Sequence, residues 1–261
     1  MENYVFVDSH CHLDRLDKTP EELSDVLNFA RNRGVEHFLC VAVSVKDFPM
    51  MLNAVKGFND VSVSCGVHPL YQEDACSYDD LLNMSDIEEV VAIGETGLDY
   101  FYSAETKSVQ LTSFVDHIKV ANKLNKPLII HTRDAREDTI DLLRQYKNPS
   151  TKGVLHCFTE TWEMAQAAIE LGMYISISGI VTFKSATELQ DVVKKIPIDK
   201  LLIETDSPWL APVPYRGKPN QPGFVREVGE FIANLKGISV EELAKVTTDN
   251  FYKLFDIETT V

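Results

Sequence analysis

The sequence has no apolar run approaching the roughly 18 residues that span a bilayer. Residues 1–15 also lack the basic segment and the long apolar segment of an export signal. The five cysteines are odd in number and include no CxxC pair, as is typical of reduced thiols in a reducing compartment. We therefore expect a soluble, cytoplasmic protein that does not bind membranes.

Positive charge is scarce, because 25 Lys and Arg residues face 40 Asp and Glu residues and the formal net charge is −15. A field of this sign repels nucleic acid and anionic membranes. The charge argues against a protein that scans DNA for sequence, but it leaves open an enzyme that meets phosphate through metal ions. GxGxxG and P-loop patterns are absent, as are long linkers and low-complexity segments.

Short β-rich apolar segments alternate with amphipathic segments of helical period. We predict strands at residues 4–8, 37–43, 61–68, 90–97, 127–132, 153–158, 174–180 and 201–206. We predict helices at residues 19–34, 46–57, 104–125, 134–147, 160–171, 184–195, 222–235 and 239–255. This alternation predicts one α/β domain over residues 1–261, a (β/α)8 TIM barrel, with a doubly wound open sheet as the rival fold.

Polar side chains collect at the carboxyl ends of most of the predicted strands. In a barrel all these ends open at one mouth, whereas in an open sheet they have no common meeting point. The pattern therefore favours the barrel, with a metal site at the C-terminal face of its strands. The residues at these ends are His10, His12, His68, Glu95, His131, His156, Glu204 and Asp206.

Side-chain alternation in a strand puts His10 and His12 on one face and Cys11 on the other. Two neighbouring imidazoles alone are often a coincidence, but the other strand-end residues make a metal site the better interpretation. The candidate ligands outnumber the three protein groups of an open zinc site and suit two divalent ions that share a carboxylate. Mg, Mn, Zn, Co and Fe all remain open. The six candidates are His10, His12, Glu95, His131, His156 and Asp206.

Two acids lie on the same face at the end of the last predicted strand. Asp206, nearer the mouth, is placed to bind a metal, to take a proton from the attacking water, or both. Glu204, one layer deeper, either holds a ligand imidazole or is an ordinary strand-end acid.

His68 either touches the substrate or is satisfied by backbone groups. Arg133 pairs either with a substrate phosphate or with a nearby acid.

A proline-rich loop, residues 207–223, follows these acids and carries Trp209 and Arg216. Aromatic and cationic side chains in such a loop either stack a base and hold a nucleic-acid backbone or pack the loop itself. The aromatic residues 100–102 pose the same choice, between contacting the substrate and covering the barrel rim.

The ordered motifs "DSHCHLD", "GVHP", "GETGLDY", "HTRDA", "LHCFT" and "ETDSPWLAP" resemble those of the TatD family of metal-dependent hydrolases, in the amidohydrolase superfamily. The resemblance extends over about residues 5–256 and implies a TIM barrel with metals at its C-terminal mouth. It further implies that one ion is bound by His10, His12 and Asp206, that Glu95 bridges, and that His131 and His156 complete the second ion.

The resemblance also implies a hydrolase, since family members are described as deoxyribonucleases, some of them 3′→5′ exonucleases that prefer single strands. We predict a two-metal phosphodiesterase acting on single-stranded DNA or DNA ends, with Asp206 and Glu95 as catalytic groups and no obligate protein partner. The alternative is hydrolysis of a carbonyl ester or amide, because some relatives deacylate D-aminoacyl-tRNA. A metal-binding barrel without turnover is disfavoured, because every ligand position is filled.

Overall fold

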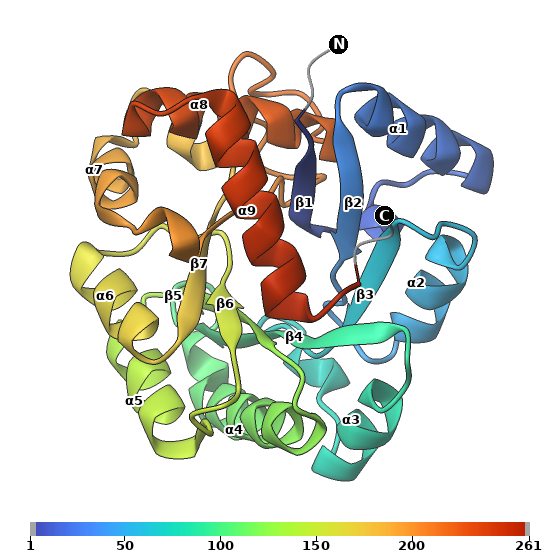
Figure 1. The fold of residues 1–261 in the computed structure, drawn as a ribbon. Helices are drawn as coiled ribbons and strands as arrows, with labels where there is room; N and C mark the ends of the chain where they lie inside the picture. Colours follow the sequence, from blue (N-terminus) through green and yellow to red (C-terminus); the bar gives the residue numbers. More distant parts are fainter. Residues whose placement is uncertain (1–3, 259–261) are drawn as a thin grey trace.

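In the computed structural model, which describes residues 4–258, eight parallel strands form one sheet in the sequence order β1 to β8 (Figure 1). The strands are β1 Phe6–Cys11, β2 Val35–Cys40, β3 Val61–Cys65, β4 Val90–Asp99, β5 Leu128–Arg133, β6 Gly153–Leu155, β7 Met173–Ile177 and β8 Leu201–Ile203. The predicted TIM barrel is confirmed. The outer bounds of the predicted domain, residues 1 and 261, lie outside the described residues.

The first and last strands meet through an isolated parallel bridge between Cys11 and Ser207. The backbone N–H of Asp206 donates to the carbonyl oxygen of His10 at 2.9 Å, and that of His12 donates to the carbonyl oxygen of Ser207 at 2.8 Å. The barrel therefore closes at the segments that carry the two histidines of β1 and the acid after β8.

Helices surround the strands in the described residues (Figure 1). They are α1 Pro20–Asn32, α2 Phe48–Val55, α3 Tyr78–Ser85, α4 Lys107–Leu124, α5 Arg136–Tyr146, α6 Trp162–Glu170, α7 Thr187–Lys195, α8 Val225–Lys236 and α9 Val240–Phe255. The capping box predicted at the start of α1 is present, with Thr19 as the N-cap. None of the helices in residues 4–258 is long and apolar enough to cross a membrane.

Two apolar layers hold the barrel together. One fills the space between strands and helices, and the other fills the barrel interior, where Val7, Val154 and Leu202 meet side chains of α9. Figure 1 shows α9 lying across one opening of the barrel. Phe251 and Phe255 of this helix pack on the interior layer. Because α9 covers the amino ends of the strands, access to the barrel interior is from their carboxyl ends.

The structure corrects the predicted elements in two respects. Helix α3 was not predicted; it begins at Ser77, whose side chain accepts from the N–H of Asp80. Several strands also end earlier than predicted, so His68, His156 and Asp206 lie in the loops that follow β3, β6 and β8. The loss of regular pairing frees these three side chains to turn toward the mouth.

Candidate metal centre

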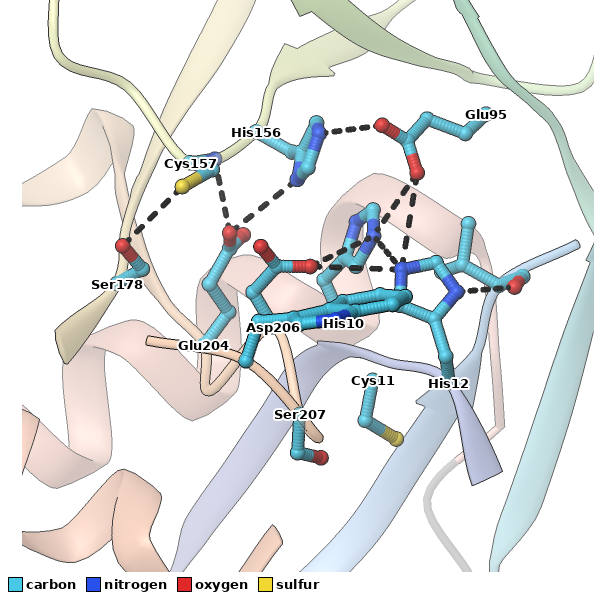
Figure 2. A network of polar contacts seen from close by, with 12 residues as sticks. His10, Cys11, His12, Glu95, His156, Cys157, Ser178, Glu204, Asp206 and Ser207 are labelled. Atoms are coloured by element: carbon cyan, nitrogen blue, oxygen red, sulfur yellow. Dashed lines mark hydrogen bonds and ion pairs between the residues drawn. The ribbon is translucent and has the colours of Figure 1, made fainter. Parts of the chain in front are cut away.

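All six predicted ligands converge at the C-terminal face, and Figure 2 shows five of them in one polar network around Glu95. β1 supplies His10 directly and His12 as the next residue beyond its end. Glu95 lies within β4, His131 within β5, His156 one residue beyond β6, and Asp206 in the loop after β8. Spread along the sequence, these residues meet because the barrel brings the ends of its strands to one mouth.

The carboxylate of Glu95 is buried, and its two oxygens face different pairs of imidazoles. Oε2 lies 3.3 Å from Nε2 of His10 and 3.7 Å from Nε2 of His12. Oε1 lies 2.7 Å from Nε2 of His156 and 3.4 Å from Nδ1 of His131. One carboxylate between two pairs of nitrogen donors has the arrangement of a group shared by two cations.

Asp206 lies beside the first imidazole pair. Its Oδ1 is 3.4 Å from Nε2 of His12 and 3.8 Å from Nε2 of His10. The side chain of Asp206 is 13% exposed, whereas that of Glu95 is 2% exposed. Asp206 is therefore the acid of the pair that solvent or a substrate reaches.

Hydrogen bonds fix which nitrogen faces the centre in His12 and in His131. Nδ1 of His12 lies 2.8 Å from the carbonyl oxygen of Val41. A carbonyl oxygen only accepts, so Nδ1 carries the hydrogen and the lone pair of the neutral ring lies on Nε2. Nε2 of His131 is likewise held by Asp99, at 3.0 Å from Oδ2, which leaves Nδ1 facing Glu95. Metal-binding imidazoles are held in the same way, by an acceptor on the far nitrogen.

The donor atoms also lie close enough together to bind metal ions. The Nε2 atoms of His10 and His12 lie 3.1 Å apart. There are three sets of candidate ligands, and within each set the ligand atoms lie within 4.8 Å of one another. Buried nitrogen and carboxylate donors aimed at a common point form the mixed set that binds divalent transition metals. These sets are His10 with His156 and Glu204, His10 with His12 and Glu95, and His68 with Glu95 and His131.

The electrostatics of the centre favour ionised acids. Burial by itself raises the pKa of the Glu95 carboxyl, but His156 and His68 beside it hold that pKa well below the ordinary value. Burial likewise opposes ionisation of Asp206, and the imidazoles of His12 and His10 lower its pKa. Two buried carboxylates that stay charged create the negative potential that a divalent cation would neutralise.

His68 differs from the other histidines. The backbone N–H of Leu70 donates to Nδ1 of His68 at 3.0 Å, so the hydrogen of the neutral ring lies on Nε2. That Nε2 is 3.1 Å from Oε1 of Glu95. His68 therefore accepts from backbone on one side and presents an N–H donor to Glu95 on the other, and its contact with the substrate stays a prediction.

Glu204 lies behind His156 and is fully buried. Its Oε1 is 3.3 Å from Nδ1 of His156 and accepts from the backbone N–H of Cys157 at 2.8 Å (Figure 2). The carboxylate thus holds the far side of the imidazole, as one of the two predictions for Glu204 has it.

Two acids in contact with this centre were not identified from the sequence. Asp99 holds His131, and alternation along β4 could have revealed it, because Asp99 is four residues from Glu95 and alternate residues of a strand share a face. Asp8 accepts from the backbone N–H and the hydroxyl of Thr205. It precedes His10 by two residues, but the register of β1 against β2 shifts between Asp8 and Cys11, so alternation along the strand does not reveal its position.

The other three predicted substrate contacts, Trp209, Arg133 and Arg216, differ in their surroundings. Trp209 is about half exposed and its ring centroid lies 5.2 Å from that of His12. Arg133 is exposed and makes no ion pair within residues 4–258. The guanidinium of Arg216 lies 4.2 Å from the ring of Phe183, which follows β7. Trp209 is thus in direct contact with the centre, whereas Arg216 is not in contact with any of its six candidate ligands.

Comparison with known proteins matches residues 7–256 to the model of a family described as TatD related DNase. The chain is 53% identical over 254 residues to the uncharacterized metal-dependent hydrolase YcfH of Escherichia coli K12, covering 97% of this chain and 96% of that protein. It is 33% identical over 244 residues to a protein of Shigella flexneri serotype 5b named 3′-5′ ssDNA/RNA exonuclease TatD, covering 91% and 94%.

Among solved structures, the TatD homologue YjjV of Escherichia coli K12 superimposes with a TM-score of 0.90 at 28% identity, over 97% of this chain and 98% of that one. The agreement thus extends from the sequence to the whole barrel. Because the family model and these relatives cover nearly the entire chain, this protein belongs to the TatD family and is a metal-dependent hydrolase.

Proposed function

We propose that this protein is a two-metal phosphodiesterase that shortens single-stranded DNA from an end. The observation that carries the proposal is the Glu95 carboxylate, whose two oxygens face separate pairs of imidazoles. In this proposal His10, His12 and Asp206 would hold one ion, His131 and His156 would hold the other, and Glu95 would contribute to both. When bound, two such ions polarise a phosphoryl group and activate water.

The chain's own residues have separate tasks in this reaction. Asp206, the more exposed of the two acids, accepts the proton of the attacking water. His68 directs its Nε2–H at the centre and donates to a phosphoryl oxygen once a metal occupies the Glu95 carboxylate. Three acceptors fix the orientation of three candidate ligand imidazoles and place the hydrogen on their outer nitrogen. The pairs are His12 with the Val41 carbonyl, His131 with Asp99 and His156 with Glu204.

DNA as the substrate is supported by the family description and by the relative named as an ssDNA/RNA exonuclease. The net charge of −15 makes local contacts, rather than the long-range field, responsible for holding the substrate. A short single-stranded end suits such a protein better than a long duplex, because it presents fewer phosphates to the same negative field.

The test is digestion of end-labelled single-stranded and double-stranded DNA by the chelated protein, reloaded in turn with Mg, Mn, Zn and Co. We expect metal-dependent shortening of the single strand, with the direction of the ladder giving the polarity. Asp206→Asn should lower the rate about 100-fold or more at equal metal occupancy, because the general base is lost.

Asp134→Asn is the matched control. Asp134 is an exposed acid just after β5, and both acids have a positive φ, 53° for Asp134 and 56° for Asp206, a conformation that asparagine tolerates. The control should keep the rate of the unaltered protein. Equal activity of Asp206→Asn would remove Asp206 from the mechanism, and no cleavage with any metal would overturn the phosphodiesterase in favour of a carbonyl ester such as D-aminoacyl-tRNA.

A further inference from the structure

Exposed aromatic side chains lie on two sides of the metal centre. Trp209, in the loop after β8, is 48% exposed and contacts His12. Phe101 and Tyr102, directly after β4, are 56% and 60% exposed. Exposed rings of this size lose hydrophobic stabilisation unless something covers them, and here both groups lie next to candidate ligands.

Arg133 completes the second group. Its guanidinium carbon lies 4.2 Å from the ring centre of Phe101 and 4.6 Å from that of Tyr102, and the two rings stand at 89° to each other. We call these three residues the Arg133 platform. The guanidinium has no carboxylate partner within residues 4–258, although the chain carries an excess of acids. An arginine that contacts aromatic rings and has no carboxylate partner keeps its hydrogen-bond donors free for an anion.

The Arg133 platform is tied to the metal centre through one carboxylate. Asp99 accepts from the backbone N–H of Tyr102 at 2.8 Å with Oδ1, and its Oδ2 lies 3.0 Å from Nε2 of His131. Arg133 itself follows His131 by two residues in β5. The position of the platform relative to the centre is therefore fixed by the same bonds that orient a candidate ligand.

The barrel topology puts the two aromatic groups opposite each other. Neighbouring strands follow in the order β1 to β8, so β4 and β5 are separated from β8 by half of the ring. The candidate ligands come from β1, β4, β5 and the loops after β6 and β8, and so lie between Trp209 and the Arg133 platform. A chain-like substrate that crosses the centre meets one aromatic group on each side.

We propose that a single strand of DNA lies across the mouth with the cleaved phosphate at the centre. The base on one side of that phosphate stacks on Trp209, and the base on the other side stacks on the Arg133 platform, whose guanidinium holds the next phosphate. This assignment rests on the proposed phosphodiesterase. Stacking on aromatic rings tolerates every base, so the enzyme is expected to degrade strands without regard to sequence.

The first test is a thermodynamic cycle on binding to the metal-loaded enzyme, with phosphorothioate oligonucleotides that resist cleavage. Removal of one base, as an abasic nucleotide beside the phosphodiester nearest the end from which the enzyme digests, should raise Kd about 10-fold, and so should Trp209→Ala or Phe101→Ala. When a variant is combined with the matching abasic nucleotide, Kd should rise no more than with either change alone. A merely structural role for the ring would give additive losses instead.

Matched variants sharpen the cycle. Phe29→Ala removes another exposed ring beneath a guanidinium, that of Arg33, but on the outer helix α1; it should leave Kd unchanged. Arg133→Gln should reduce the slope of log Kd against log salt by about 0.7, the value for one phosphate contact on a single strand, and Arg133→Lys should keep that slope.

Fluorescence gives an independent reading, because Trp162 and Trp209 are the tryptophans of the chain. Trp162→Phe leaves Trp209 as the reporter. Its emission should be quenched more by an intact oligonucleotide than by one that is abasic beside the phosphodiester nearest the digested end.

Parallel digestion of an ordinary oligonucleotide separates the outcomes. Cleavage together with additive losses would overturn the base contacts and leave the phosphodiesterase standing. Coupled losses without cleavage would support the base contacts and overturn the phosphodiesterase. Failure to bind and to cleave DNA would overturn both.

Discussion

Asp8 and Thr205 join the first and last strands of the barrel through two buried hydrogen bonds. Oδ1 of Asp8 accepts from the backbone N–H of Thr205 at 2.8 Å, and Oδ2 accepts from its hydroxyl at 2.6 Å. Regular pairing at this seam is limited to the single bridge beside it. Because Asp8 precedes His10 by two residues and Thr205 directly precedes Asp206, the same bonds fix the distance between the two halves of one candidate ion site.

Thr205→Val should lower the free energy of unfolding by about 2 kcal/mol, because Oδ2 of Asp8 then lies buried without its hydroxyl donor. Thr205→Ser keeps the hydroxyl and should lose about 1 kcal/mol or less. Urea unfolding of the chelated proteins measures both values. Because valine keeps the methyl group and serine keeps the hydroxyl, a Thr205→Val protein as stable as the unaltered one would show that the bond with Asp8 does not stabilise the seam.

Asp99→Asn should weaken metal binding about 10-fold to 100-fold, because the carboxylate that holds Nε2 of His131 is replaced by a neutral amide. Competition with a chromophoric chelator measures the dissociation constant. Asp134→Asn, the same change at an exposed acid near the end of β5, is the control and should bind metal as the unaltered protein does. Identical affinities in the two variants would mean that Asp99 does not support the imidazole.

The fold and the set of candidate ligands were predictable because both depend on local patterns. Apolar segments bounded by polar residues located the strands, and the two-residue period placed His10 and His12 on one face. Helix α3 escaped prediction because its eight residues bury a single apolar side chain, that of Leu81. Helix α2 is equally short but buries three apolar side chains, which made its period visible. The early ends of β3, β6 and β8 depend on where neighbouring strands stop pairing, which no local pattern contains.

The role of each aromatic side chain at the mouth was not predictable, because it depends on residues distant in the sequence. Tyr215 stacks on Phe224 at a centroid distance of 3.9 Å and so packs the proline-rich loop. Trp209, six residues earlier, contacts His12 from the other end of the chain. The contact of Tyr215 thus assigns its ring to packing of the loop, whereas stacking of a base on Trp209 stays a prediction.

His117 gives a prediction for stability against pH. It is buried in α4, where Nδ1 lies 2.7 Å from the carbonyl oxygen of Ser113 and Nε2 accepts from the N–H of Val67. Burial lowers the pKa of His117 to about 4. Below pH 6.5 the unfolded chain therefore binds a proton that the folded protein does not, and stability falls as the pH drops from 6.5 toward 4.

From pH 7 to pH 5 this one histidine should account for a loss of about 2 kcal/mol. In His117→Gln the amide oxygen can still accept from Val67. Its free energy of unfolding should fall by about 2 kcal/mol less over the same pH range, as measured by urea unfolding of the chelated proteins. Burial also lowers the pKa of His37 to about 4, but His37 titrates in both proteins and cancels in the difference. The same pH dependence in both proteins would contradict a neutral, buried His117.

Gly97 permits the close approach of β4 to β5 at the centre. It pairs with His131, its φ is +131°, and a Cβ atom there would lie 2.0 Å from the carbonyl oxygen of His131. An alanine must therefore push His131 away from Glu95. We expect Gly97→Ala to lower the free energy of unfolding by about 3 kcal/mol or more, the sum of backbone strain and steric overlap, and to weaken metal binding.

Gly172→Ala separates these two contributions. Gly172 also has a positive φ, +84°, but an added Cβ would meet nothing within 4 Å, so strain alone should cost about 1–2 kcal/mol. Gly172 directly precedes β7 and so lies at the amino ends of the strands, opposite the centre, which should leave metal binding unaffected. Urea unfolding and metal titration of both variants test the argument, since equal losses and equal metal affinities would show that contact with His131 is not what requires a glycine at position 97.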